Sequence, residues 1–216
     1  MNRSSLRLGA VGLAVLLAAG AAPVYADAAG ERFHGVYAAI YQGWTHYNVD
    51  VDLPGGDSMG GLGAAGGVGG VIVGTGALFG RDYLGFEAGV RLQSGADFDA
   101  DAPDLQLDTE QSVYLGARFG RVVGAGLHPP LLFYFGAGVQ RTEFRAELAG
   151  STGRQQLDAM RLAFGAEVAG SDGGFFRGEY ALAYYPGDDI EVADGVDVEV
   201  TGATAGQFTV AAGYRW

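Results

Sequence analysis

The sequence of 216 residues contains no cysteine, so disulfide bonds are excluded and stability must come from packing and backbone pairing. Beyond its N-terminal segment the chain also lacks any run of about 18 consecutive apolar residues, which excludes a transmembrane helix there. Basic residues are scarce, with 13 Lys and Arg against 25 Asp and Glu and a net charge of −12 at pH 7. This balance excludes a general nucleic-acid-binding protein, because binding to phosphates requires a basic face.

Residues 1–26 have the features of a secretory signal peptide. Two arginines precede an apolar stretch over residues 8–22, and a small-x-small cleavage site ends at Ala26. The apolar stretch is shorter than the roughly 20 residues that a membrane-spanning helix requires. We therefore predict cleavage after Ala26 and a mature chain, residues 27–216, that forms one domain.

Apolar residues and glycine are abundant instead. The chain is 49% hydrophobic, has a mean hydropathy of +0.14 and contains 39 glycines. Its apolar residues alternate with small or polar ones in segments that glycine- and aspartate-rich connections interrupt, a pattern typical of transmembrane β-barrels. We predict an all-β protein, a closed eight-stranded antiparallel up-and-down transmembrane β-barrel. The predicted strands lie at residues 32–48, 66–80, 83–97, 108–122, 130–147, 156–170, 174–186 and 200–216.

The segment LGFEAGVRLQSG shows the alternation most clearly. Leu84 and Phe86 share one face of this strand, whereas Glu87 and Arg91 share the other. Because an arginine facing the bilayer midplane costs about 2–4 kcal/mol, we expect the apolar face to contact lipid and the charged face to line the lumen. The segment GGVGGVIVGTGALF is nearly all small and aliphatic, so the pattern does not assign its faces.

Charged residues in the middle of the predicted strands all fall on the lumen-facing set. They are Glu87, Arg91, Arg118, Arg161, Glu167, Arg177 and Glu179. Side chains just fill the interior of an eight-stranded barrel, and unpaired buried charge is strongly destabilising. We therefore predict a nearly neutral Arg/Glu network that closes the lumen, with inward-facing glycines making room for it. A soluble lipocalin-like barrel is the alternative, and its two faces would be exchanged.

The connections between the predicted strands alternate in length. Two of them, at residues 80–82 and 171–174, are short, whereas four acidic or polar loops are longer. Outer-membrane barrels have short periplasmic turns and long external loops, and an even number of strands brings both termini to the periplasmic side. The loops at residues 49–65, 97–108 and 186–200 are those that we expect to meet an external ligand or a host surface.

Aromatic residues on the lipid-facing set are expected to form a girdle at the two membrane interfaces. We place Trp44 and Tyr184 near the outer interface, and Phe119, Phe133 and Phe176 near the periplasmic one. Tyr214 and Trp216, at the end of the last strand, would join the periplasmic girdle.

These features resemble the small eight-stranded outer-membrane β-barrels of Gram-negative bacteria, the OmpA/OmpX-type and opacity-protein-like "porin family" barrels. The resemblance rests on the signal peptide, the first strand FHGVYAAIYQGWTHY, the alternating strands and the ending Gly-Tyr-Arg-Trp. It implies a monomer in the outer membrane, surrounded by lipid and lipopolysaccharide. It also implies that the barrel-assembly machinery reads a C-terminal signal, here Phe208, Val210, Tyr214 and Trp216.

The resemblance is specific for architecture and weak for activity. A scaffold with adhesion-type external loops is the preferred interpretation, because Arg–Glu pairs across the lumen should block free passage of solutes. A narrow channel for small solutes, or a pathway for small hydrophobic compounds, is the alternative.

We expect neither catalysis nor a cofactor. Of the three histidines only His46 lies near the external rim, and nothing in the sequence places a serine beside it as nucleophilic catalysis requires. The acidic loops could bind divalent cations. However, the run from Asp97 to Asp101 lacks the glycine and glutamate of an EF-hand loop, and we predict no metal site.

Overall fold

The computed structural model describes residues 31–52, 58–94, 105–123, 129–148, 151–193 and 196–216. After the short 3-10 helix η2 (Glu31–Phe33), the described chain forms eight strands. They are β1 (Gly35–Asp52), β2 (Ser58–Phe79), β3 (Asp82–Ser94), β4 (Leu105–Val123), β5 (Leu131–Leu148), β6 (Ser151–Ala169), β7 (Gly174–Ala193) and β8 (Val196–Arg215). The predicted signal peptide lies outside the described residues. In the described part of the chain, no helix is both long and apolar enough to cross a membrane.

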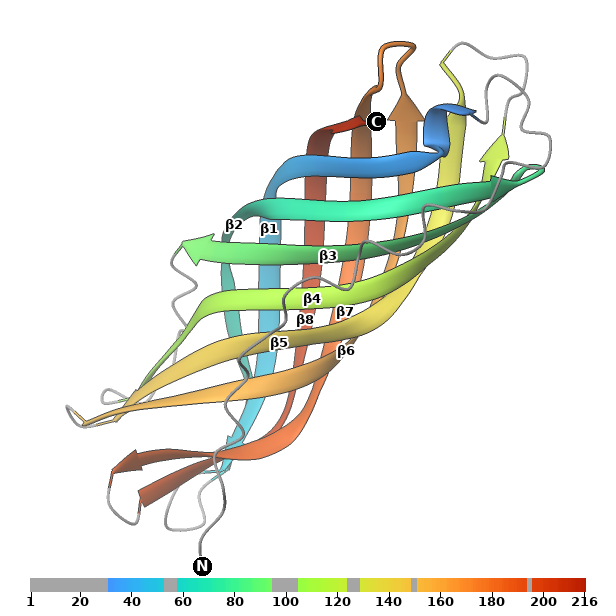
Figure 1. The fold of residues 1–216 in the computed structure, drawn as a ribbon. Helices are drawn as coiled ribbons and strands as arrows, with labels where there is room; N and C mark the ends of the chain where they lie inside the picture. The colour runs from blue at the N-terminus through green and yellow to red at the C-terminus, as the bar shows by residue number, and fades with distance from the viewer. Residues whose placement is uncertain (1–30, 53–57, 95–104, 124–128, 149–150, 194–195) are drawn as a thin grey trace, which may run out of the picture.

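All eight strands pair antiparallel with their sequence neighbours, and β1 pairs with β8 to close the barrel (Figure 1). The seam runs from Tyr37 opposite Arg215 to Asp52 opposite Glu199. At its end the Trp216 N–H donates a hydrogen bond to the Val36 carbonyl at 2.9 Å. Closure satisfies the backbone groups of both edge strands, which is the requirement for a sheet in hydrocarbon. The predicted fold class is confirmed.

Two tight connections lie at the barrel end that carries η2 and the C-terminus (Figure 1). Gly80 joins β2 to β3 with a φ of 70°, in the left-handed region that glycine tolerates best. Between β6 and β7, Gly173 has a φ of 90°, and its carbonyl accepts a hydrogen bond from the Arg215 N–H at 2.9 Å. This end is called the turn end below, and the opposite one the loop end.

At the loop end most strands are longer than the sequence predicted, whereas β3 is described as strand only to Ser94 and the rest of its predicted range, to residue 97, lies outside the described residues. β7 continues to Ala193 and β8 begins at Val196, where the prediction placed a loop over residues 186–200. β5 and β6 likewise pair out to Leu148 opposite Ser151. The prediction was wrong there because acidic residues indicated loops, whereas alternating valine and isoleucine favour extended pairing. The predicted loops 49–65 and 97–108 are also partly strand, and their remaining residues lie outside the described ones.

At the start of the barrel the prediction was wrong by a few residues. Residues 31–33 form η2 rather than strand, and β1 begins only at Gly35. Gly35 has a φ of 114°, and a Cβ added there would lie 2.1 Å from the Trp216 carbonyl oxygen. The chain therefore needs glycine where it turns from η2 into the seam.

The outer wall of the barrel carries a continuous set of exposed apolar side chains, called the apolar belt below. Its members include Ile40, Val71, Phe86, Leu115, Phe135, Val139, Met160, Leu162, Phe164 and Leu182, all at least half exposed. On β2, whose faces the sequence did not assign, Val71 and Val73 point outward while Val68 and Ile72 are buried. Since the apolar residues lie outside and the charged ones inside, the soluble-barrel alternative is wrong.

Inside the barrel, tyrosine rings lie over glycines of the neighbouring strand. Tyr37 is the register partner of Gly74, where an added Cβ would lie 2.4 Å from its ring. Tyr134 covers Gly165 in the same way, with 2.4 Å between the added Cβ and its hydroxyl. Tyr114 opposite Gly89 and Tyr41 opposite Gly70 repeat the arrangement. These inward glycines thus make room for aromatic rings, whereas the prediction was room for charged side chains.

Candidate functional site in the barrel lumen

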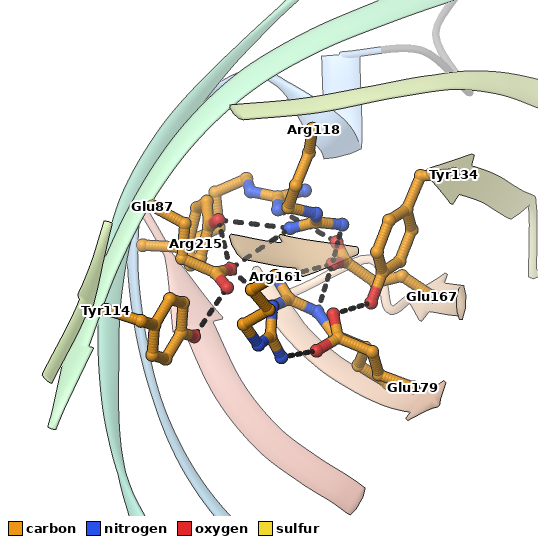
Figure 2. Close-up of polar contacts among 10 residues, drawn as sticks. Glu87, Tyr114, Arg118, Tyr134, Arg161, Glu167, Glu179 and Arg215 are labelled. Atoms are coloured by element: carbon orange, nitrogen blue, oxygen red, sulfur yellow. Dashed lines mark hydrogen bonds and ion pairs between the residues drawn. The ribbon is translucent and has the colours of Figure 1, made fainter. Parts of the chain in front are cut away.

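The centre of the lumen is the carboxylate of Glu167, on β6, which is fully buried. Its Oε2 accepts hydrogen bonds from Arg118 Nη2 at 3.2 Å and from Arg177 Nη2 at 2.9 Å. Its Oε1 accepts one from Arg215 Nη2 at 2.8 Å. Three guanidinium groups from β4, β7 and β8 therefore converge on one carboxylate (Figure 2).

A second carboxylate, that of Glu87 on β3, lies beside the first. Arg177 Nη1 bonds to its Oε2, and Arg118 Nη1 lies 3.5 Å from the same atom. The hydroxyls of Tyr37 and Tyr114 donate to its two oxygens at 2.7 Å and 2.6 Å. Because Arg118 and Arg177 each contact both glutamates, these residues form one connected cluster rather than separate pairs.

The third carboxylate belongs to Glu179, on β7. It bonds to Arg161 Nη2 and accepts a hydrogen bond from the Tyr134 hydroxyl at 2.7 Å (Figure 2). The Tyr134 ring also stacks on the Arg118 guanidinium, whose carbon lies 3.8 Å from the ring centre. Aromatic faces stabilise such cations when both are removed from water. The tyrosines over the inward glycines thus serve as hydrogen-bond donors and as faces for the arginines.

Six of the seven predicted lumen residues are brought together in this ionic cluster, and Arg91 is not. Arg91 is buried nearer the loop end, where Nη1 donates to Gln207 Oε1 at 2.7 Å and Nη2 to Ser112 Oγ at 2.9 Å. Ser112 continues into a chain of hydroxyls through Thr142. Within the described residues no carboxylate forms an ion pair with Arg91. Its hydrogen-bond partners Gln207 and Ser112 are both uncharged.

Sequence reasoning missed Arg215, which is 5% exposed and binds Glu167. The alternation of β8 could have identified it, because Arg215 falls on the inner face, opposite Tyr214 and Trp216. Tyr37, Tyr114 and Tyr134 were also missed, although they lie on the same inner face as the charged residues. With Arg215 included, the described lumen holds five buried or half-buried arginines against three buried glutamates. The excess of two positive charges corrects the expectation of a nearly neutral network.

Apolar and aromatic side chains close the lumen on both sides of these polar layers. At the turn end, Phe33 of η2 packs into a buried cluster with Leu78, Tyr83, Val122, Leu132, Tyr134 and Ala169. Toward the loop end, Phe144 forms edge-to-face contacts with Tyr47 and Tyr185, with ring centres 6.1 Å and 5.4 Å apart. Between them lies a cavity of about 20 Å³ that Arg91, Arg161 and Glu179 help to line. This volume holds about one water molecule.

The residues predicted for the aromatic girdle all lie on the outer wall. Trp44, Phe119, Phe133, Phe176 and Tyr184 are between 52% and 72% exposed. The four residues predicted for the C-terminal signal, Phe208, Val210, Tyr214 and Trp216, share that wall with exposures between 46% and 68%. The rings of Tyr214 and Trp216 meet edge to face at 5.4 Å, at the turn end.

His46 lies on the outer wall near the loop end, with its ring over Gly206. His34 is exposed beside η2 at the opposite end of the barrel, and His128 lies outside the described residues. The two described histidines, His34 and His46, therefore lie at opposite ends of the barrel. In the described ranges no group of three or more His, Cys, Asp or Glu side chains could hold a metal ion, and Asp97, Asp99 and Asp101 fall outside those ranges.

Comparison with known families identifies the class of protein. Residues 12–216 match the model of the family described as outer membrane protein beta-barrel domain, and the chain belongs to this family. The resemblance inferred from the alternating strands is thereby confirmed. The protein is an outer-membrane β-barrel.

The fold is similar to several solved structures. Ail, the attachment invasion locus protein of Yersinia pestis, is 10% identical over 85% of this chain and 99% of its own, with a TM-score of 0.47. OprG from Pseudomonas aeruginosa is 14% identical over 86% and 99%, also with a TM-score of 0.47. Neisserial surface protein A is 13% identical over 82% and 99%, with a TM-score of 0.43. A search of curated protein sequences gives no match.

Proposed function

We propose that this outer-membrane barrel is a monomeric envelope scaffold that presents its loop end to external ligands or surfaces and does not conduct solutes. The observation that carries the proposal is the filled lumen. Guanidinium groups on β4, β7 and β8 reach across to the buried carboxylate of Glu167, and aromatic clusters lie above and below. The cavity left between these layers is water-sized. A solute could pass only if several buried ion pairs separated, which is strongly unfavourable.

Conductance of the refolded protein in planar bilayers tests the closed lumen. We expect no discrete steps, with a general porin inserted under the same conditions as the positive control. Ohmic steps from the wild-type protein would overturn the scaffold in favour of the narrow channel. Arg118→Ser is the informative variant, because it removes one of the two arginine side chains that contact both Glu87 and Glu167. Steps appearing only in this variant would identify the ionic cluster as the barrier.

The proposed contact with lipopolysaccharide is supported by the outer wall of β5 and β6 at the loop end. Three arginines occupy outward-facing positions there, between the apolar belt and the loop end: Arg141, Arg145 and Arg154. Guanidinium groups suit phosphate, although Arg141 also pairs with Asp158 and Arg154 with Glu143. We expect the triple Arg→Gln variant to bind lipopolysaccharide micelles more weakly than wild type. Arg121→Gln, an exposed arginine at the turn end, is the matched control, and equal losses in both would contradict the assignment.

Biogenesis supplies a further test of the proposed roles of the two chain ends. We propose that export removes residues 1–26 and that Phe208, Val210, Tyr214 and Trp216 are read by the assembly machinery. N-terminal sequencing of the envelope-inserted protein should then begin at Asp27. Trp216→Ser should lower insertion in cells while leaving refolding in detergent nearly unchanged. Equal losses in cells and in detergent would instead assign Trp216 a purely structural role.

A lipid-modifying activity is the competing class, and we propose that it is absent. His46 is the residue on which such an activity would depend, since it lies at the lipid-facing wall near the loop end. Comparison of membrane lipid profiles between cells with the wild-type protein and with His46→Ala tests this. We expect identical profiles, and a lipid product lost in the variant would overturn the proposal.

A further inference from the structure

We infer that the lumen holds one small inorganic anion of the chloride class, bound beside Arg91. This site borders the ionic cluster, whose Arg161, Arg177 and Glu179 line one side of the same cavity. It is carried by three observations: a buried arginine without a carboxylate, a cavity against it, and an excess of positive charge in the described lumen. The inference goes beyond the proposed scaffold function, because an anion could occupy the cavity whether or not the lumen conducts.

Arg91 is the first of these observations. Its side chain is 3% exposed, and its hydrogen-bond partners Gln207 and Ser112 are neutral. Its Nε has no hydrogen-bond partner among the described residues. Arginine stays protonated in proteins, so the charge cannot be removed by loss of a proton. A buried cation of this kind is destabilising unless an anion lies near it.

The cavity supplies the place for that anion. Its volume is about 20 Å³, enough for one particle the size of a water molecule. Arg91 lines it from β3, and the hydroxyl-bearing residues Tyr41 and Thr209 line it from β1 and β8. Guanidinium and hydroxyl groups both donate hydrogen bonds, which is the chemistry that a small anion requires.

The charges around the cavity favour an anion over water. Three arginines and one glutamate line it: Arg91, Arg161, Arg177 and Glu179. Arg161 is paired with Glu179, and Arg177 is shared between two other carboxylates, so Arg91 carries the uncompensated charge. One bound chloride would lower the excess in the described lumen from two positive charges to one.

Chloride NMR line widths test this inference on the full barrel refolded in a neutral detergent. Wild type should broaden the chloride signal in a saturable manner, and bromide should compete. Arg91→Gln should weaken this binding about tenfold or more, since it removes a charge-assisted contact. Arg121→Gln, which removes the same charge from an exposed ion pair at the turn end, should bind as wild type does.

Tyr41→Phe keeps the charge and nearly the shape, so it remains informative if Arg91→Gln fails to fold. It should weaken chloride binding several-fold without loss of the barrel. Crystals grown in bromide should show an anomalous peak in the cavity. An absence of saturable broadening in wild type would mean that only water fills the cavity. Equal binding by wild type, Arg91→Gln and Tyr41→Phe would place the anion elsewhere, and either result overturns the inference.

Discussion

The inner and outer faces of the same strands meet opposite environments one residue apart. On β4, Arg118 is 3% exposed, while the next residue, Phe119, is 56% exposed. The outer face only needs to be apolar, because lipid adapts to any apolar surface. The inner face needs particular partners, because a buried charge must be matched by groups that other strands supply. Substitutions should therefore be judged by face before they are judged by residue type.

The largest effect is expected inside, at Glu167. Glu167→Ala leaves three buried guanidinium groups without their shared carboxylate, and should lower the free energy of unfolding by about 3–5 kcal/mol. Urea unfolding of the refolded barrel in lipid vesicles measures this loss. Glu143→Ala, whose half-buried carboxylate lies 3.9 Å from Arg154 near the loop end, is the control and should have little effect. Similar losses in the two variants would show that the inner face is not special.

The same experiment probes the outer face at Leu162, in the apolar belt. Leu162→Arg places a charge toward lipid and should cost about 2–4 kcal/mol. Leu162→Ala separates the charge from the lost side chain and should cost much less, because position 162 is 59% exposed to the surroundings of the barrel. If arginine were tolerated as well as alanine, the belt would not face hydrocarbon.

Two glycines on neighbouring strands sharpen the comparison at the level of a single methyl group. A Cβ on inward-facing Gly165 would lie 2.4 Å from the Tyr134 hydroxyl, whereas one on Gly178 would meet nothing within 4 Å. Gly165→Ala should destabilise by about 1–3 kcal/mol through overpacking. Gly178→Ala should be neutral or stabilising by about 0.4–1 kcal/mol. The midpoint denaturant concentrations of the two variants, each compared with wild type, measure these effects. Equal midpoints for the two variants would contradict the packing of Tyr134 on Gly165.

The smallest effect is expected at the loop-end rim, where the outer face becomes polar. Arg141 Nε and Nη2 hydrogen-bond to the two carboxylate oxygens of Asp158, and these bonds hold the pKa of Asp158 below its usual value. The pair therefore stabilises the barrel above the ordinary pKa of aspartate, and this contribution is lost as pH falls through the lowered value.

Because both side chains are solvent-exposed, Asp158→Asn should cost only about 0.2–1 kcal/mol at neutral pH. Unfolding curves over a pH series measure the difference. The curves of wild type and Asp158→Asn should converge in acid. A difference that persisted in acid would assign the effect to packing rather than to charge.

Strand number, pairing order and the direction of the side chains could all be predicted from the alternation. A period of two residues assigns each side chain to a face, and charges such as Glu87 and Arg118 identified the inner one. Strand ends were harder to predict, since the acidic segments near Asp188 and Asp197 extend the β7–β8 hairpin instead of ending it. On β2, where small residues dominate, only pairing with β1 and β3 showed that Ile72 faces inward.

The partners within the lumen could not be predicted in the same way. Arg91 and Arg118 share a face and the same charge, yet Arg91 bonds to neutral Gln207 and Ser112 whereas Arg118 bonds to two glutamates. Arg215 was overlooked beside the aromatic C-terminus, although Glu167 binds it from a distant strand. Such contacts depend on the position of each side chain along the barrel axis. That position follows from the tilt of the strands and from their register.

By itself the sequence determined that the chain forms a closed sheet with an apolar outer face and a charged inner face. Alternation along a strand is a local property of the sequence, and it is required because charges are unfavourable in hydrocarbon and must lie inside the barrel. The tertiary structure alone decided which arginine meets which glutamate, which tyrosine lies over which glycine, and that Arg91 has a cavity in place of a counter-ion. These contacts join residues far apart in the sequence, such as Arg91 and Gln207, which are separated by 116 positions. They exist only once the barrel closes with a definite register.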